Sequence, residues 1–295
     1  MLRHRLLAGV AGVVVVALVV AAVIVIPLLA GTPTRAPTVA SAPRSSASVS
    51  ATPSASPSPT PTPSATPIAP PAPPPPPASR QYPLHTGIVS TTFWVGEIFD
   101  PNAADGSQMI STYDSDWFGS YGGCDGVVTG GGCETEARTA GNGFFPTQMT
   151  PRQNPFYLDL PFDDVNDSTA RAMRQSVIPW AGDPAYRGAG TNENISLMKN
   201  RWVRISANGQ TCYGQIEDAG PGEYHDAAYV FGTGNTRPAN KRYNGAGMDV
   251  SPALNGCLHF AELDGQDDVV SWQFVEASEV PPGPWKRIVT TSGVR

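Results

Sequence analysis

The sequence predicts a mainly β domain of about 215 residues that follows an apolar N-terminal segment and a proline-rich stretch. Three observations lead to this prediction. Short runs of alternating apolar and polar residues, separated by glycine-rich turns, fill residues 81–295, as in β proteins. Residues 6–31 contain no charged side chain. Residues 32–80 hold 16 of the 31 prolines and no acidic residue, a composition that cannot build a hydrophobic core.

The uncharged segment is long enough to cross a bilayer, because roughly 20 apolar residues span the hydrocarbon core. A cleavable signal peptide has a shorter apolar region of about 7–15 residues, so the length favours an uncleaved signal anchor. Arg3 and Arg5 precede the segment and favour a cytoplasmic N-terminus. We therefore expect residues 1–31 to anchor the chain in the cell membrane with a single pass and an extracytoplasmic C-terminal domain. Cleavage near residues 29–31 would instead give a secreted protein.

The stretch 32–80 consists almost entirely of Pro, Ser, Thr and Ala. Such a composition favours extended, solvated chain that rises about 3.1 Å per residue. We expect a disordered stalk that holds the domain away from the membrane.

Charge is distributed unevenly along the chain. All 25 acidic residues but only 14 of the 19 basic residues lie in residues 81–295, which gives this domain a formal net charge of −11. A strongly acidic domain argues against a nucleic-acid partner. The same charge would also repel anionic wall polymers.

Six segments of the domain have the alternation and β-branched or aromatic content of strands. They are Gly87–Gly96, Trp202–Ser206, Thr211–Glu217, Gly247–Val250, Val269–Glu276 and Arg287–Thr291. A hairpin through Ala207-Asn-Gly-Gln joins the second segment to the third.

Two aspartates each end an apolar run and precede a turn. Asp218 is followed by Ala-Gly-Pro, which predicts a strand end, where functional side chains are common. Asp249 is followed by Val-Ser-Pro. Ser251 before Pro252 is typical of a helix N-cap with proline in the first helical position, so we expect a strand-to-helix corner.

The pattern (I/V)xDxGP followed by (M/F/I)D(V/L)Sx.A resembles the double-psi β-barrel domains of rare lipoprotein A, the expansins, barwin, family 45 endoglucanases and the membrane-bound lytic transglycosylase A. The resemblance covers Ile88–Val95 and Arg201–Thr291. It implies a six-stranded double-psi β-barrel in which residues 98–200 form a large, loop-rich insertion. It also implies a polysaccharide partner, either peptidoglycan or another wall glycan.

The resemblance further implies catalytic roles. In the lytic transglycosylase, the residue that matches Asp249 is the catalytic acid/base, and the residue that matches Asp218 lies beside it. In the endoglucanases, a partner carboxylate follows the first strand. Here Val95 occupies that position, so Glu97 would have to replace the missing acid. Glycosidic cleavage commonly uses such a carboxylate pair.

The same acids also have a structural interpretation. An aspartate before Gly-Pro or Val-Ser-Pro can accept hydrogen bonds from turn or helix-start amides, and Glu97 could be an exposed charge at a strand end. Expansins retain the corner aspartate and do not hydrolyse polysaccharide, so a non-catalytic wall-binding module is the alternative function. A protein-binding module that uses the insertion is a third. An apolar, partly closed setting would raise the pKa of Asp249 and favour the catalytic interpretation.

Flat aromatic side chains supply stacking surfaces for sugar rings, and they also pack in cores. Five lie near the acids in sequence or in the insertion, and we take them as candidate substrate-binding residues: Trp94, Trp117, Tyr121, Tyr213 and Tyr224. Three other tryptophans are expected in the core: Trp202, Trp272 and Trp285.

Four cysteines outside the membrane predict two disulfides, and of three possible pairings we prefer Cys124–Cys133 with Cys212–Cys257. The CxxC spacing of zinc sites does not occur, and we expect neither a metal nor a cofactor. Residues 158–164 place three carboxylates in a proline-marked segment. These could bind calcium or form a solvated rim, and we expect the rim.

Overall fold

The computed structural model describes residues 80–103, 106–190 and 192–295. The predicted anchor and stalk therefore lie outside the described residues. Within the described ranges, no helix has the length and apolar character needed to span a bilayer.

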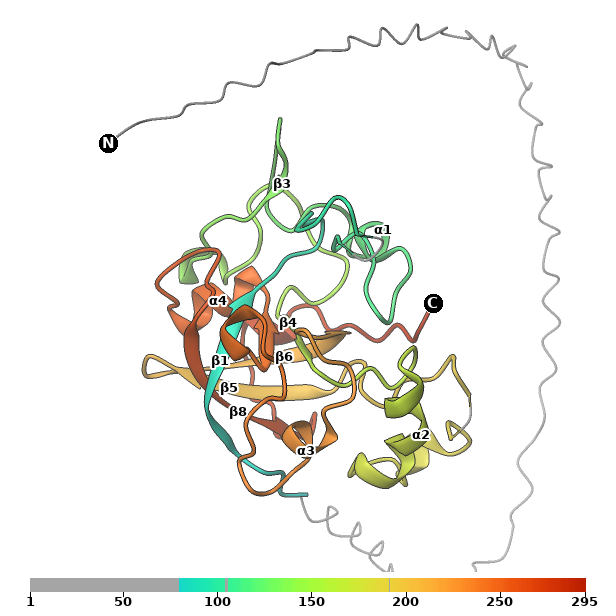
Figure 1. The fold of residues 1–295 in the computed structure, drawn as a ribbon. Coiled ribbons are helices and arrows are strands. Elements are labelled where there is room, and N and C mark those ends of the chain that lie inside the picture. Colours follow the sequence, from blue (N-terminus) through green and yellow to red (C-terminus); the bar gives the residue numbers. More distant parts are fainter. Residues whose placement is uncertain (1–79, 104–105, 191) are drawn as a thin grey trace, which may run out of the picture. The chain divides into compact units, whose positions relative to one another are not determined.

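Six strands close into a mixed β-barrel in the order β1-β7-β4-β6-β5-β8 (Figure 1). The neighbours β1 and β7 run parallel, as do β4 and β6, and the remaining neighbours run antiparallel. The barrel strands are β1 (His85–Thr92), β4 (Tyr157–Leu160), β5 (Trp202–Ala207), β6 (Gln210–Ala219), β7 (Met248–Val250) and β8 (Asp268–Val275).

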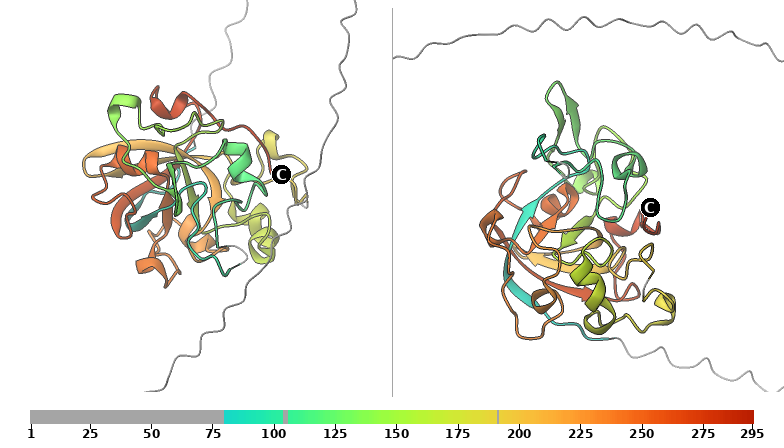
Figure 2. Two further views of the ribbon diagram at one scale, coloured as in Figure 1. Left: turned by 90° about the horizontal axis from the view of Figure 1, so that it is seen from above. Right: turned by 45° about the vertical axis from the view of Figure 1, so that its right-hand side comes forward.

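Short helices and a separate hairpin surround the barrel. The hairpin of β2 (Val127–Thr129) and β3 (Gly132–Glu134) projects away from it (Figures 1 and 2). The helices are α1 (Trp117–Tyr121), α2 (Ser168–Val177), α3 (Ala227–Val230) and α4 (Pro252–Leu258).

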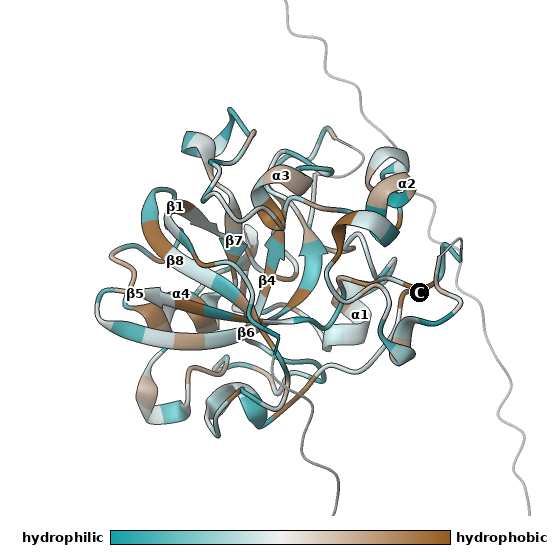
Figure 3. Ribbon diagram, turned by 90° about the horizontal axis from the view of Figure 1, so that it is seen from below, coloured by the Kyte–Doolittle hydropathy of each residue, from teal (hydrophilic) through white to brown (hydrophobic). Residues whose placement is uncertain are grey.

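Apolar side chains from all six barrel strands form the main core, and hydrophobic and hydrophilic residues alternate along several strands (Figure 3). The three tryptophans expected in the core are buried there, with exposed fractions of 5% for Trp202, 0% for Trp272 and 9% for Trp285. Trp272 stacks on the buried ring of His85 with 4.2 Å between the ring centroids. Burial of this histidine lowers its pKa to about 4, so it packs as a neutral aromatic ring.

Five of the six predicted strands are confirmed, with shifts of a few residues at their ends. The hairpin between β5 and β6 is confirmed as well, with Ala207 opposite Gln210. Its two turn residues, Asn208 and Gly209, both have positive φ, as a tight two-residue turn requires.

The predicted strand Arg287–Thr291 is wrong. Its first residue ends a short 3₁₀ helix, Pro284–Lys286, and the following chain is irregular. The amide of Thr290 donates to the side chain of Gln215 (2.9 Å) instead of to a neighbouring strand. This segment therefore lies along the barrel without joining the sheet.

The sixth barrel strand is β4, which lies inside the segment predicted as an insertion. Its four residues are all buried, and it is hydrogen-bonded to β6 on one side and β7 on the other. Pro155 and Pro161 bound it closely, so it is short for a strand and has no exposed face that would show alternation. The region 98–200 is consequently divided by the barrel and is not one continuous insertion.

Both predicted disulfides are confirmed. Cys124–Cys133 joins the chain before β2 to β3. Cys212–Cys257 joins β6 to α4, the two elements that lie next to the candidate aspartates.

Candidate active site

Three aspartates occupy matching positions on three adjacent strands, and we call them the aspartate row. Asp159 of β4 lies opposite Asp249 of β7 and also opposite Asp218 of β6. Residues in register on neighbouring strands place their side chains on the same side of the sheet. The barrel therefore brings together acids that are separated by as many as 90 positions in the sequence.

An irregularity in strand pairing creates this arrangement. Leu158 pairs with Ile216, but Asp159 pairs with Asp218, so Glu217 is skipped. A bulge of this kind moves one side chain out of the alternating pattern. Without it, Asp159 would lie opposite Glu217, and Asp218 would face the other side of the sheet.

Asp249 lies at the predicted strand-to-helix corner. It is the middle residue of β7, and Ser251 caps the following α4 by accepting a hydrogen bond from the amide of Leu254 (3.3 Å). Its side chain is partly buried, and Oδ1 has no hydrogen-bond partner among the described residues. Burial, together with repulsion from Glu97 and Asp218, raises the pKa of Asp249 to about 8. The carboxyl group is therefore mostly protonated at neutral pH.

Asp218 ends β6 as expected, and it combines both interpretations. Its Oδ1 accepts hydrogen bonds from the amides of Thr112 (2.7 Å) and Ala219 (2.8 Å), so the residue does organise a turn. Burial nevertheless raises its pKa to about 7, because it outweighs these two hydrogen bonds.

Asp159 is the functional candidate that sequence reasoning missed. It is only 4% exposed, and its Oδ1 accepts a hydrogen bond from the amide of Asp249 (2.9 Å). Burial and the charges of Asp249 and Asp218 raise its pKa well above the ordinary range. A signal was present, because Asp159 also follows an apolar run and lies two residues before a proline, much as the other two acids lie three residues before one.

The aspartate row lacks a compensating cation. The ion pairs of the described residues include none of its three members and not Glu97. Buried carboxylates without a cation or full hydrogen bonding hold a proton instead of a charge. The row therefore favours the protonated forms of its acids, and Asp218, with a pKa of about 7, remains partly ionised at neutral pH.

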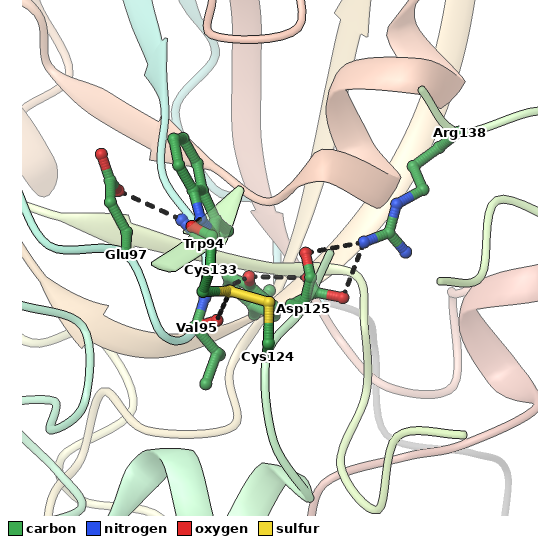
Figure 4. Close-up of a disulfide and its surroundings, with 8 residues drawn as sticks. Trp94, Val95, Glu97, Cys124, Asp125, Cys133 and Arg138 are labelled. Carbon is green, nitrogen blue, oxygen red and sulfur yellow. Dashed lines mark hydrogen bonds and ion pairs between the residues drawn. A yellow bond between two sulfur atoms is a disulfide. The ribbon is translucent and has the colours of Figure 1, made fainter. Parts of the chain in front are cut away.

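Glu97 follows β1 and is partly buried, not an exposed strand-end charge. Burial raises its pKa to about 8, against a weak hydrogen bond from the amide of Trp94 (3.4 Å). Figure 4 shows Glu97 and Trp94 beside the Cys124–Cys133 disulfide, and the indole N–H of Trp94 donates to the carbonyl of Cys133 (2.8 Å). The hairpin thereby fixes the segment that brings Glu97 near Asp249.

The expected solvated rim in residues 158–164 is wrong. Asp163 and Asp164 are 5% and 0% exposed, and Asp159 belongs to the aspartate row. Asp163 accepts hydrogen bonds from the amides of Val165 (2.9 Å) and Asn166 (2.8 Å). Asp163 thus orders the turn after β4, whereas Asp164 is buried against Ser196, Leu197 and Arg174.

Three of the five candidate aromatic residues are buried and cannot stack on a sugar. Trp117 and Tyr121 are buried in a small core with Tyr157, so their rings have no exposed face for a sugar. Trp94 is also buried. Tyr213 packs on Trp285 and lines a separate pocket of about 410 Å³.

Tyr224 is the most accessible of the five, with 40% of its surface exposed. It follows β6 by a few residues, and its carbonyl accepts a hydrogen bond from the amide of Asp163 (2.8 Å). It is therefore the aromatic candidate best placed to meet a ligand near the aspartate row.

Among the residues that the structure describes, no three His, Cys, Asp or Glu side chains are arranged as ligands for a metal ion. A second pocket of about 390 Å³ lies between α1 and the C-terminal segment, and it does not include the aspartate row. Comparison of the chain with models of protein families and with curated proteins gives no match in either set.

Proposed function

We propose that the chain cleaves a cell-wall glycan, with Asp249 as the general acid/base and Asp159 and Asp218 as its partners. The observation that carries the proposal is the aspartate row itself: three carboxyl groups in register, partly closed from water and without a cation. A general acid needs a pKa near the working pH, and the raised pKa of Asp249 provides a proton at neutral pH.

A lytic transglycosylase reaction fits these groups best. Asp249 donates its proton to the glycosidic oxygen as the bond between that oxygen and C1 of the sugar breaks. The carboxylate form of Asp218, which a pKa of about 7 leaves partly populated at neutral pH, stabilises the positive charge that develops at C1. The C6 hydroxyl of the same sugar then attacks C1 and returns its proton to Asp249. No water needs to be activated, so the absence of an acid at Val95 is not an obstacle.

The proposal also includes the type of β-barrel. We take the closed barrel to be a double-psi barrel, and its support is the mixed topology, with parallel pairs β1–β7 and β4–β6 in one closed sheet. The predicted anchor would hold this domain outside the cell membrane, where wall glycans are found.

A non-catalytic glycan-binding module is the second candidate. The observation that favours it is the bonding of Asp218, whose carboxylate holds the amides of Thr112 and Ala219 as a purely structural acid would. In that case the row would order the loops around a binding surface.

The test is incubation of the full-length chain, purified in detergent, with peptidoglycan and separately with β-glucan. Soluble products are analysed by mass spectrometry. We expect anhydro-sugar products from peptidoglycan, and none from an Asp249→Asn variant.

Asp267→Asn is the matched control, because Asp267 is an exposed acid outside the row. It should retain full activity. If the parent chain releases no product but sediments with the polymer, and Asp249→Asn sediments equally well, the catalytic proposal fails and the binding module remains.

A further inference from the structure

The pocket between α1 and the C-terminal segment is lined mostly by hydrogen-bond donors, although the domain as a whole is acidic. Its volume is about 390 Å³. Figures 1 and 2 show the C-terminus beside α1, and Arg295 donates to the hydroxyl of Ser120 on that helix (2.8 Å). The lining residues that carry donors are Ser120, Arg152, Gln153, Thr290, Thr291, Ser292 and Arg295.

The two guanidinium groups of the pocket are exposed and lightly engaged. Arg152 makes one weak hydrogen bond, to the carbonyl of Gly119 (3.4 Å). Arg295 bonds Ser120 and lies 4.0 Å from a carboxylate oxygen of Asp114. Each guanidinium carries five N–H donors, so most of them remain available to a ligand.

Gln153 adds a buried donor that has no partner. The residue is 5% exposed, and its Nε2 makes no hydrogen bond among the described residues. The orientation of its amide is fixed, because Oε1 accepts from the indole N–H of Trp117 (3.0 Å), and an indole nitrogen can only donate. The NH₂ group must therefore take the other position, on a residue that lines the pocket.

An unpaired buried N–H is unfavourable until an acceptor reaches it. Ser292 presents the same situation, since its buried hydroxyl also lacks a partner. The one acid that lines the pocket, Asp116, is exposed to water, where its charge is screened. Two guanidinium groups outnumber it.

We propose that this pocket binds the carboxylate of a ligand, with Arg152 and Arg295 as its donors and the buried amide of Gln153 in its wall. Arginine pairs with carboxylates through two parallel hydrogen bonds, and an additional buried amide donor favours an acceptor-only group over a neutral hydroxyl. Two sources of this group are considered, a peptide carboxylate attached to a glycan and the carboxylate of a sugar acid.

One short segment contacts both the aspartate row and the C-terminal residue of the pocket. The amide of Thr112 holds Asp218, the carbonyl of Tyr113 accepts from the amide of Arg295 (3.2 Å), and α1 follows directly. A glycan whose scissile bond lies at the row could thus place an acidic substituent in this pocket. This choice of ligand rests on the proposed function, whereas binding of a carboxylate does not require that the glycan be cleaved.

The test is calorimetric titration of the full-length chain in detergent with three probes. They are an N-acetylmuramoyl dipeptide, a trimer of galacturonic acid, and neutral triacetylchitotriose. We expect one or both acidic probes to bind, with affinity that falls as salt is added, and the neutral probe to bind at least about tenfold more weakly. If only one acidic probe binds, it identifies the source of the carboxylate, and binding of both shows that the pocket accepts either source.

Two variants locate the site. Arg152→Gln removes an exposed charge and should weaken binding of the acidic probe by about tenfold. Gln153→Glu retains an acceptor for the indole of Trp117 and replaces the free donor with a repelling oxygen, so binding should be lost. Arg187→Gln removes an equivalent charge outside the pocket and should bind as the parent does.

Equal binding of the neutral and acidic probes would overturn the proposal, as would unchanged affinity in both pocket variants or no binding of either acid. The assay measures no cleavage. A chain that binds the dipeptide but releases no product would therefore disprove the catalytic proposal and leave the pocket assigned.

Discussion

Two buried acid sites lie along strand β4, and they differ in how the negative charge of the acid is compensated. Near its start, Tyr157 donates to Asp125 (2.8 Å), which also accepts from Arg138 (2.9 Å), and both side chains of that ion pair are fully buried (Figure 4). Two residues later, Asp159 begins the aspartate row, in which acids face one another. We call the first site the paired network.

The contrast shows which buried acids serve structure. Asp125 has a cation and a hydroxyl donor, so its charge is satisfied by the fold and helps to fix the β2–β3 hairpin to the barrel. Asp159 and Asp249 have no cation partner among the described residues, and in that setting they can exist at low cost only as neutral acids. An arrangement that favours protonated carboxyls contributes little to stability, which is consistent with the proposed role in proton transfer.

The largest effect is expected from Asp249→Asn. Activity should fall by about 10³-fold, because a general acid contributes about 10²–10⁴ to the rate. The free energy of unfolding should be unchanged or higher, because a repelling carboxyl is removed. Product release measures the activity, and chemical denaturation measures the free energy of unfolding. A variant that loses activity only because it is less stable would contradict the contrast between the aspartate row and the paired network.

Arg138→Met tests the paired network. It leaves Asp125 buried without its cation, which should lower the free energy of unfolding by about 3–5 kcal/mol. Urea denaturation measures the loss. The double variant Asp125→Asn/Arg138→Met should recover part of it, and a single variant as stable as the parent would show that the network is not structural.

Each disulfide belongs to one of the two regions and closes a loop of different length. Cys212–Cys257, beside the aspartate row, spans 45 positions. Cys124–Cys133, at the β2–β3 hairpin, spans 9. Loop-closure entropy predicts that replacing the first pair with alanine lowers stability by about 4 kcal/mol and the second by about 3 kcal/mol. Thermal or urea unfolding of both variants checks this order, which the reverse ranking would contradict.

The pH dependence of stability should come from the aspartate row and Glu97, and not from the paired network. Burial raises the pKa of Asp249 and Glu97 to about 8 and of Asp218 to about 7, from unfolded values near 4. Between those limits the folded chain binds more protons than the unfolded chain. The contribution of these acids to the free energy of unfolding is therefore fully present at about pH 4 and is lost as the pH rises through the folded pKa values.

As the pH rises between the unfolded and folded pKa values, each group lowers the free energy of unfolding by at most about 1.4 kcal/mol per pH unit. Urea titrations at about pH 5, 7 and 9 measure the slope. Asp249→Asn should make the slope shallower, because Glu97 and Asp218 still titrate, and the matched variant Asp267→Asn should leave it unchanged. A parent chain whose stability rises over this range would disprove the raised pKa values.

Much of the site could be predicted because local patterns specify it. Asp218 before Gly-Pro and Asp249 before Val-Ser-Pro correctly indicated a strand end and a strand-to-helix corner. Both disulfides followed from the number of cysteines and their separation. The buried tryptophans followed from the pattern of the strands that carry two of them.

The sequence by itself determined these local elements, since turns, caps and alternation depend on neighbouring residues. Only the tertiary structure decided that the third acid is Asp159, that β4 replaces the predicted strand at Arg287–Thr291, and that a bulge at Glu217 turns Asp218 toward the row. Register between strands far apart in the chain depends on packing and on hydrogen bonds that close only when the barrel forms. Burial, and with it the protonation of the row, exists only in the closed barrel.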